Sequence, residues 1–340
     1  MRVARLTRER PWFRALVTLR GSVVPAIWRQ VLGCGLFGLV ISALYANGVE
    51  VVSQPLFESI VSSVVLGLLL VFRTNTAYER FWEGRKCWGG IVNGTRNLVR
   101  QILVAVESPN EVERERKAAA IRLVASFSIA MKQHLRNEPL YWNEVEGLMT
   151  PRQYEILQAV NHPCLEIAVW IDDYLQVQQR QGRLQVYQLT GMMAILSQLI
   201  DALGATERIL KTPVPLAYSI HLRQLLLIYC LALPFPLVEG LGWLTGPVVA
   251  LVGFTLLGIE AIGLEIENPF GHDPNDLPLD AICVTIRQNM ENLIQLGPDC
   301  GRDDAEATEI SDDGDQPCQS QVSRLRRLAP PSSKGSPPKS

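Results

Sequence analysis

Residues 59–88 read SIVSSVVLGLLLVFRTNTAYERFWEGRKCW. The first fourteen of them carry no charge, whereas the stretch that follows, 73–88, carries six. If both stretches form one helix, most of the aromatic residues and one arginine share a face at helical spacing: Tyr78, Phe81, Trp82, Arg85 and Trp88. Because Trp and Tyr favour the membrane–water boundary, the stretch predicts a membrane helix that continues into water.

The composition of the whole chain also indicates a membrane protein. Of the 340 residues, 48% are hydrophobic and 19% are charged, and the mean hydropathy is +0.12. Two windows of twenty uncharged residues, 30–49 and 240–259, are long enough to cross a bilayer. Two shorter windows, 59–72 and 224–238, would also suit buried core helices. Each shorter window adjoins a long one, so two membrane hairpins are the simpler interpretation.

The basic residues predict which side of the membrane each region faces. Seven arginines precede the first span, against a single acid, Glu9: Arg2, Arg5, Arg8, Arg10, Arg14, Arg20 and Arg29. The turns at 50–58 and near Glu239 contain no lysine or arginine. The positive-inside rule therefore places both termini and the long middle region in the cytoplasm. We expect an integral multi-pass protein in contact with membrane lipid.

Helical patterns dominate the rest of the chain. Apolar residues at helical spacing predict helices over 111–135, 153–180, 184–210 and 277–296. The alternating pattern of strands is missing from the sequence, so the predicted fold class is all-α. From residue 301 onward the composition offers almost nothing to bury, which predicts a disordered tail.

These features divide the chain into six predicted segments. They are a cytoplasmic N-terminal segment (1–29), a first transmembrane hairpin (30–72), a cytoplasmic helical domain (73–213), a second transmembrane hairpin (214–262), a cytoplasmic C-terminal helical segment (263–300) and the tail (301–340).

The sequence gives no positive sign of catalytic chemistry. The seven cysteines form no CxxC pair and the four histidines are scattered, so we expect free thiols rather than disulfides or structural zinc. GCGLFG at 33–38 has the form of a dinucleotide fingerprint, but it lies inside an uncharged span, where glycines more often allow close helix packing. The net charge of −2 creates no field for nucleic acid. We expect neither an enzyme nor a nucleic-acid-binding protein.

An apolar stripe runs along the predicted helix that begins near residue 60. Ile60, Val64 and Leu68 recur every four residues and so lie on one helix face. Such a stripe either packs against a neighbouring helix or lines a narrow pore, where a hydrophobic constriction gates ions by dewetting. The stripe alone does not separate these two interpretations.

Three segments resemble the bestrophin family of ion channels, in its bacterial and plant branch. They read FRTNTAYERFWEGRKCWGG (72–90), ATERILKTPVPLAYSIHLRQLLLIYCLALPFPLVE (205–239) and EIENPFGHDPNDLPLD (265–280). The similarity runs in the same order over roughly residues 10–297 and leaves out the tail.

The resemblance implies a homopentamer around one axial pore in a bacterial cytoplasmic membrane. Each subunit would supply four transmembrane helices and a cytoplasmic helical domain. The neck of the pore would lie on the second membrane helix, at Ile60, Val64 and Leu68. A second constriction, the cytoplasmic aperture, would lie at Tyr187, and Arg73 would be a charge at the pore entrance.

The resemblance also raises the question of calcium. Animal members bind Ca²⁺ after the NPFG motif, and the matching positions here are Asn268, Asp273 and Asp276. Oxygen ligands suit Ca²⁺, but Pro274 and Asn275 replace part of the acidic run. The alternative is that Asp273 and Asn275 cap a helix that begins nearby. No other cofactor is expected.

The expected function is a channel for small monovalent ions that favours anions such as chloride over cations. Arg73 would favour anions if it faces the pore, and Glu79 and Glu83 would oppose it if they do. Two alternatives stay open. One is a cation-selective channel of the same fold, and the other is a membrane-anchored helical scaffold or signalling protein without conductance.

Overall fold

The computed structural model describes residues 21–53 and 60–297, with only the helical backbone described at 60–62. These residues form two compact units: residues up to 87 together with 205–278, and residues 88–204 together with those from 279 onward. Within the described ranges the only β feature is an isolated bridge between Glu146 and Met149, so the all-α fold class is confirmed. The predicted tail, 301–340, and most of the predicted segment 1–29 lie outside the described residues.

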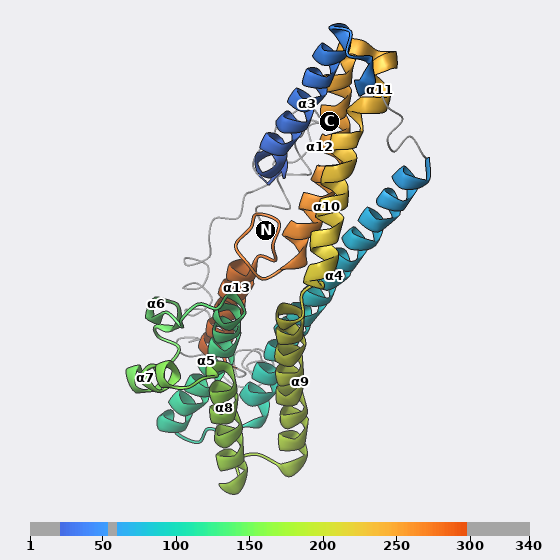
Figure 1. Ribbon diagram of the computed structural model, residues 1–340. Coiled ribbons are helices and arrows are strands. Elements are labelled where there is room, and N and C mark those ends of the chain that lie inside the picture. The colour runs from blue at the N-terminus through green and yellow to red at the C-terminus, as the bar shows by residue number, and fades with distance from the viewer. Residues whose placement is uncertain (1–20, 54–59, 298–340) are drawn as a thin grey trace, which may run out of the picture. The chain divides into compact units, whose positions relative to one another are not determined.

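The first unit contains the predicted membrane hairpins. Its elements are α3 (Val24–Ala46), η1 (Glu50–Val52), the first part of α4 (Ile60–Ala105), the end of α9 (Val186–Lys211), α10 (Leu216–Ala232), α11 (Pro234–Leu241), η2 (Gly242–Leu244) and α12 (Thr245–Glu267). Within this unit α3 and α12 lie side by side (Figure 1). The helix α3 begins at Val24, six residues before the uncharged window, and in its second turn the guanidinium of Arg29 lies 5.5 Å from the centre of the Trp28 ring.

Glycines allow the close approach of α3 and α12. A Cβ atom added to Gly38 would lie 3.0 Å from the Cα atom of Gly246, and one added to Gly35 would lie 3.0 Å from the Cβ atom of Ala250. Contacts this short leave no room for a side chain. The GCGLFG stretch is therefore a helix-packing motif in a continuous helix and not a phosphate-binding turn, as the sequence indicated.

The second predicted hairpin contains a break that the sequence window did not anticipate. The window 224–238 was expected to be one helical span, but α10 ends at Ala232 and α11 begins at Pro234. Proline has no N–H group to donate and its ring clashes with the preceding turn, so it ends or kinks a helix. Pro234 and Pro236 therefore separate a short α11 from α10, and Gly242, with a φ of +51°, turns the chain into α12.

Three described segments are long and apolar enough to cross a membrane. They are α3, α9 and the block Leu216–Glu267, which contains α10 to α12. The sequence placed α9 in the cytoplasmic region, whereas its composition also suits a membrane.

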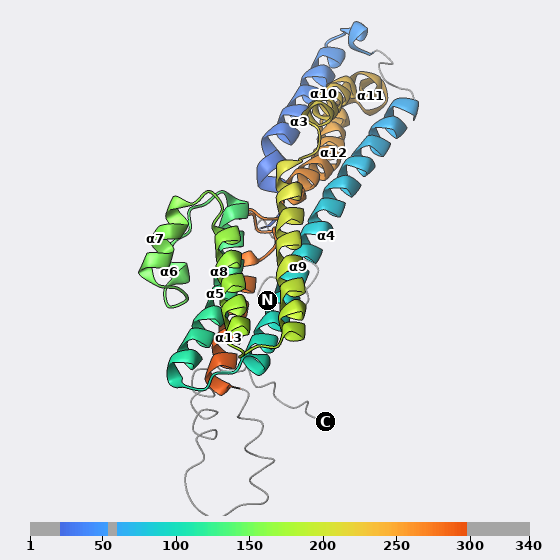
Figure 2. The ribbon, with the colours of Figure 1, turned by 90° about the horizontal axis from the view of Figure 1, so that it is seen from below.

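The second unit is a helical bundle. Its elements are the last part of α4, α5 (Glu111–Arg136), α6 (Trp142–Val145), α7 (Pro151–Ala159), α8 (Pro163–Arg180), the first part of α9 and α13 (Leu279–Leu296). Helix α5 packs against α8 and α13, and the short α6 and α7 lie together beside α5 and α8 (Figure 2). The predicted helix over 153–180 is divided because Thr150 starts α7 with a capping box and Pro163 starts α8.

Candidate pore-lining helix

Helix α4 has one packed face and one bare face in the first unit. Leu66 and Leu70 are 5% and 2% exposed, and they form a core cluster with Leu222 and Leu226 of α10. On the other side Val64 is 53% and Leu68 is 52% exposed. The two predicted neck residues that can be placed therefore lie on the face that the subunit leaves uncovered.

Polar contacts fix this orientation of α4. The hydroxyl of Tyr218 donates to the carbonyl oxygen of Leu69 at 2.9 Å, and the hydroxyls of Ser63 and Tyr229 lie 3.1 Å apart. Since both tyrosines belong to α10, they hold the same side of α4 that Leu66 and Leu70 bury. The third predicted neck residue, Ile60, begins α4, but its side chain lies outside the described residues.

Arg73 lies on the packed side of α4. Its side chain is 1% exposed, and its Nη2 atom lies 2.5 Å from Oε2 of Glu267 at the end of α12. The other carboxylate oxygen of Glu267 accepts the backbone N–H of Val214 at 2.9 Å. A role at the pore entrance does not fit this placement, because a buried and paired guanidinium presents no charge to water.

The other charges after the neck have separate partners. Arg80 donates to the backbone carbonyls of Ile209, Thr212 and Glu267, and so joins the ends of α9 and α12. Glu83 is paired with Arg208 of α9. Glu79 and Glu83 were the two acids expected to disfavour anions at the pore. Glu79 is exposed, and no ion pair is described for it, whereas the charge of Glu83 is partly neutralised by Arg208.

Lys86 is an exposed cation on the same face of α4 as the neck stripe. It follows Leu68 by eighteen residues, which is about five full turns, and Trp82 follows Val64 by the same interval. The Nζ atom of Lys86 lies 5.9 Å from the centre of the Trp82 ring. Sequence reasoning missed this lysine, although extending the stripe along the helix would have found it.

Tyr187 is an accessible aromatic residue on the first turn of α9. Its side chain is 90% exposed, which leaves the ring free for contacts outside the subunit. Its assignment to a cytoplasmic aperture stays a prediction.

The proposed calcium-binding loop is a closed turn after α12. The N–H of Asp273 donates to Oδ2 of Asp276 at 2.8 Å, and the N–H of Phe270 donates to Oδ1 of Asn268 at 3.4 Å. A Cβ at Gly271 would lie 2.8 Å from Oδ2 of Asp276, so a larger residue there would displace the Asp276 carboxylate. Two of the three proposed ligands thus accept hydrogen bonds within the loop. The calcium site stays a prediction.

The alternative role for this loop was to cap a helix. The described side-chain bonds of Asn275 go instead to Oε1 of Glu265 at 2.9 Å and to the carbonyl oxygen of Gly21 at 3.2 Å. Asn275 therefore ties the loop to the end of α12 and to the residues before α3.

Comparison with known proteins identifies the family. The profile described as bacterial and fungal bestrophin protein matches residues 5–292. A voltage-dependent anion channel-forming protein of Nostoc sp. is 57% identical over 290 residues, which cover 85% of this chain and 94% of the relative. A protein of the same description from Synechocystis sp. is 52% identical over 289 residues, with the same two coverages.

Solved structures agree with this assignment. A bacterial bestrophin homolog from Klebsiella pneumoniae has a TM-score of 0.71 at 28% identity, and the match covers 80% of this chain and all of that one. The profile covers most of the chain, and two relatives share more than half of the aligned residues. The chain is therefore a membrane protein of the bestrophin family.

Proposed function

We propose that this chain forms a homopentameric channel that conducts small monovalent anions such as chloride through an axial pore. In this proposal Ile60, Val64 and Leu68 of α4 line the neck, Tyr187 lies at the cytoplasmic aperture, and both termini are cytoplasmic. The names of the relatives, which describe voltage-dependent anion channel-forming proteins, support the choice of anions.

The observation that carries the proposal is the division of α4 into two faces. Leu66 and Leu70 are packed against α10, whereas Val64 and Leu68, on the opposite face of α4, are half exposed. Copies of the chain related by a rotation axis would bring this bare face together around the axis. A ring of such side chains makes a dry constriction that conducts when it widens enough to stay wet.

An apolar neck cannot by itself distinguish an anion from a cation, so the selectivity must come from charges near it or from the dehydration cost. Lys86 lies about 27 Å along α4 from Leu68, on the same face. A ring of lysines at that level would raise the local concentration of anions. Glu79, nearby on the same helix, acts in the opposite direction.

The test is the reversal potential of the purified protein in a planar bilayer with asymmetric KCl. We expect the reversal potential to approach the chloride equilibrium potential. A value near the potassium equilibrium potential would establish the cation-selective alternative. The absence of current under every ionic condition would favour the scaffold alternative.

The role of Lys86 is tested in the same bilayer. We expect Lys86→Glu to move the reversal potential toward that of potassium. Arg114→Glu is the matched control, because it makes the same charge change at an exposed position on α5. If the two variants shift the potential equally, Lys86 has no special position relative to the pore.

A further inference from the structure

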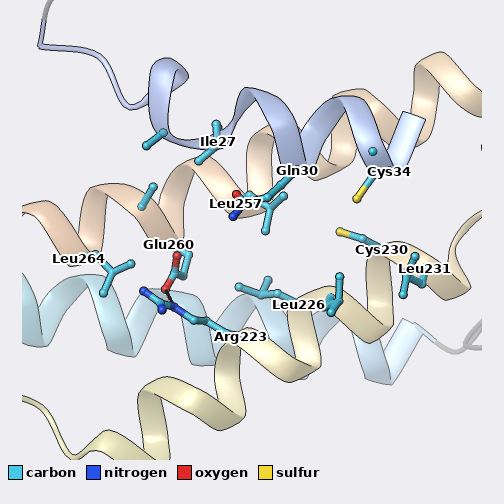
Figure 3. Close-up of a pocket in the computed structure, with 14 residues that line it drawn as sticks. Ile27, Gln30, Cys34, Arg223, Leu226, Cys230, Leu231, Leu257, Glu260 and Leu264 are labelled. Atoms are coloured by element: carbon cyan, nitrogen blue, oxygen red, sulfur yellow. Dashed lines mark hydrogen bonds and ion pairs between the residues drawn. The ribbon is translucent and has the colours of Figure 1, made fainter. Parts of the chain in front are cut away.

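A cavity of about 550 Å³ lies between α3, α10 and α12 in the first unit (Figure 3). Its volume falls within the range of about 300–1,000 Å³ that is usual for small-molecule sites. All three helices belong to segments that are apolar enough to cross a membrane. The cavity is therefore a site that membrane lipid can reach.

One end of the cavity is polar. Nε of Arg223 on α10 donates to Oε1 of Glu260 on α12 at 2.9 Å, and Gln30 of α3 also lines the cavity (Figure 3). The side chain of Arg223 is 57% exposed, whereas that of Glu260 is 11% exposed. Among the described residues Glu260 is the only polar partner of Arg223, so the Nη atoms of the guanidinium are open to the cavity and its surroundings.

The other end of the cavity is apolar. Leu226 and Leu231 of α10, Leu257 of α12, and the facing thiols of Cys34 and Cys230 line it (Figure 3). Arg223 precedes Cys230 by seven residues, which is about two helical turns. The lining therefore holds one charged pair, with Ile27 and Leu264 at the same end, and is apolar toward Cys34 and Cys230 (Figure 3).

The polar end lies near one end of all three helices. Arg223 is in the second turn of α10, Glu260 is two turns from the end of α12, and Ile27, in the first turn of α3, approaches the α12 backbone near Gly258. Arginine near the end of a membrane helix extends its charge toward the headgroup region while its stem stays in the apolar layer. The position of Arg223 is therefore typical of a side chain that reaches the headgroup level.

We propose that this cavity binds an anionic phospholipid of the surrounding bilayer. The lipid phosphate accepts hydrogen bonds from the Nη atoms of Arg223, while Glu260 holds the guanidinium through Nε. One acyl chain lies along Leu226, Leu257 and Leu231. Basic pockets between membrane helices are known to suit anionic headgroups, and a guanidinium binds phosphate with two parallel hydrogen bonds.

The first experiment measures lipid retention and does not depend on conductance. The full-length protein is placed in phosphatidylcholine nanodiscs that contain a minority of phosphatidylglycerol, released, and weighed with its bound lipid by native mass spectrometry. We expect phosphatidylglycerol to be retained about tenfold over phosphatidylcholine, the equivalent of one hydrogen bond to a charged group. Equal retention of the two lipids would overturn the proposal.

Two variants locate the binding to this cavity. In the double variant Arg223→Gln with Glu260→Gln, the charges are removed together and no unpaired charge is left behind, so we expect the preference for phosphatidylglycerol to disappear. Gly33→Leu adds a side chain where nothing lies within 4 Å, on the cavity wall. We expect Gly33→Leu to reduce retention of the lipid by about tenfold, and its stability should hold because leucine favours a helix more than glycine does.

The matched control is Gly240→Leu. Gly240 is also helical with open space around it, but it does not line the cavity. It should retain lipid as the parent does. Persistence of the preference in the double variant, or equal loss in Gly33→Leu and Gly240→Leu, would place the bound lipid elsewhere. Inorganic phosphate should not displace the lipid, and displacement by phosphate alone would show an anion site that needs no acyl chain.

Discussion

At the scale of single residues, the ion pair between Arg73 and Glu267 joins positions 194 residues apart in the chain. Arg73 is 1% and Glu267 is 15% exposed, so loss of the carboxylate would leave a buried, uncompensated charge. Breaking such a pair usually costs about 3–5 kcal/mol. We therefore predict that Glu267→Gln lowers the thermal unfolding midpoint of the detergent-solubilised protein by several degrees.

The control for this prediction is Asp173→Asn, which removes an exposed ion pair with Arg180 at 3.7 Å. Exposed pairs contribute about 0–1 kcal/mol, so this variant should unfold close to the parent. Equal midpoints for Glu267→Gln and the parent would mean that the pair does not hold α4 to α12.

A second residue-scale prediction concerns acid. Partial burial alone would raise the pKa of Asp280, but hydrogen bonds from Arg136 and Lys132 outweigh it and lower the pKa to about 2. The ordinary pKa of an unpaired aspartate carboxyl is 3.8. Because the folded pKa is the lower one, the stabilisation is complete above pH 3.8 and is lost as the pH falls toward about 2.

We predict that the unfolding midpoint of Asp280→Asn falls less steeply than that of the parent between about pH 4 and pH 2. The expected difference is modest, since the Asp280 side chain is 62% exposed and partly screened. Glu115→Gln, at an exposed position on the same α5 as Arg136, should keep the slope of the parent. Parallel slopes for Asp280→Asn and the parent would contradict the assignment.

At the scale of elements, periodicity predicted most helices, and the errors have local causes. The ends of α5 and α13 lie within two residues of the predicted ones, because one face of each helix is buried in a single core. The prediction of one helix over 224–238 was wrong because it rested on the absence of charged residues and did not consider that Pro234 interrupts the helix. The glycines of α3 predicted that another helix packs closely against it, but they did not identify α12 as that helix.

The contact between α3 and α12 gives a prediction at this scale. We expect Gly38→Val to destabilise the protein by about 1–3 kcal/mol, because its Cβ would lie 3.0 Å from the Cα atom of Gly246 and backbone cannot move aside cheaply. Thermal unfolding in detergent measures the loss. Gly33→Ala, on the same helix but with open space, should be neutral or stabilising. A neutral Gly38→Val would show that the two helices can separate.

At the scale of the whole molecule, the sequence shows which residues of a helix share a face but not which partners the fold brings to them. Arg73 shows why: it follows Val64 by nine residues, about two and a half turns, and so lies opposite the neck stripe. The helical count excludes it from that face, but its partner Glu267 follows only from the fold. Lys86, by the same count, lies on the face of Leu68.

The final prediction separates the two faces of α4 in the assembled protein. We expect Val64→Ala with Leu68→Ala to increase the bilayer current, because smaller side chains widen the proposed neck, and to leave the unfolding midpoint near that of the parent, because both residues are half exposed. Leu70→Ala on the packed face should do the reverse, costing about 2–5 kcal/mol of stability without raising the current. If the double variant conducts like the parent while Leu70→Ala conducts more, the pore lies on the other face of α4.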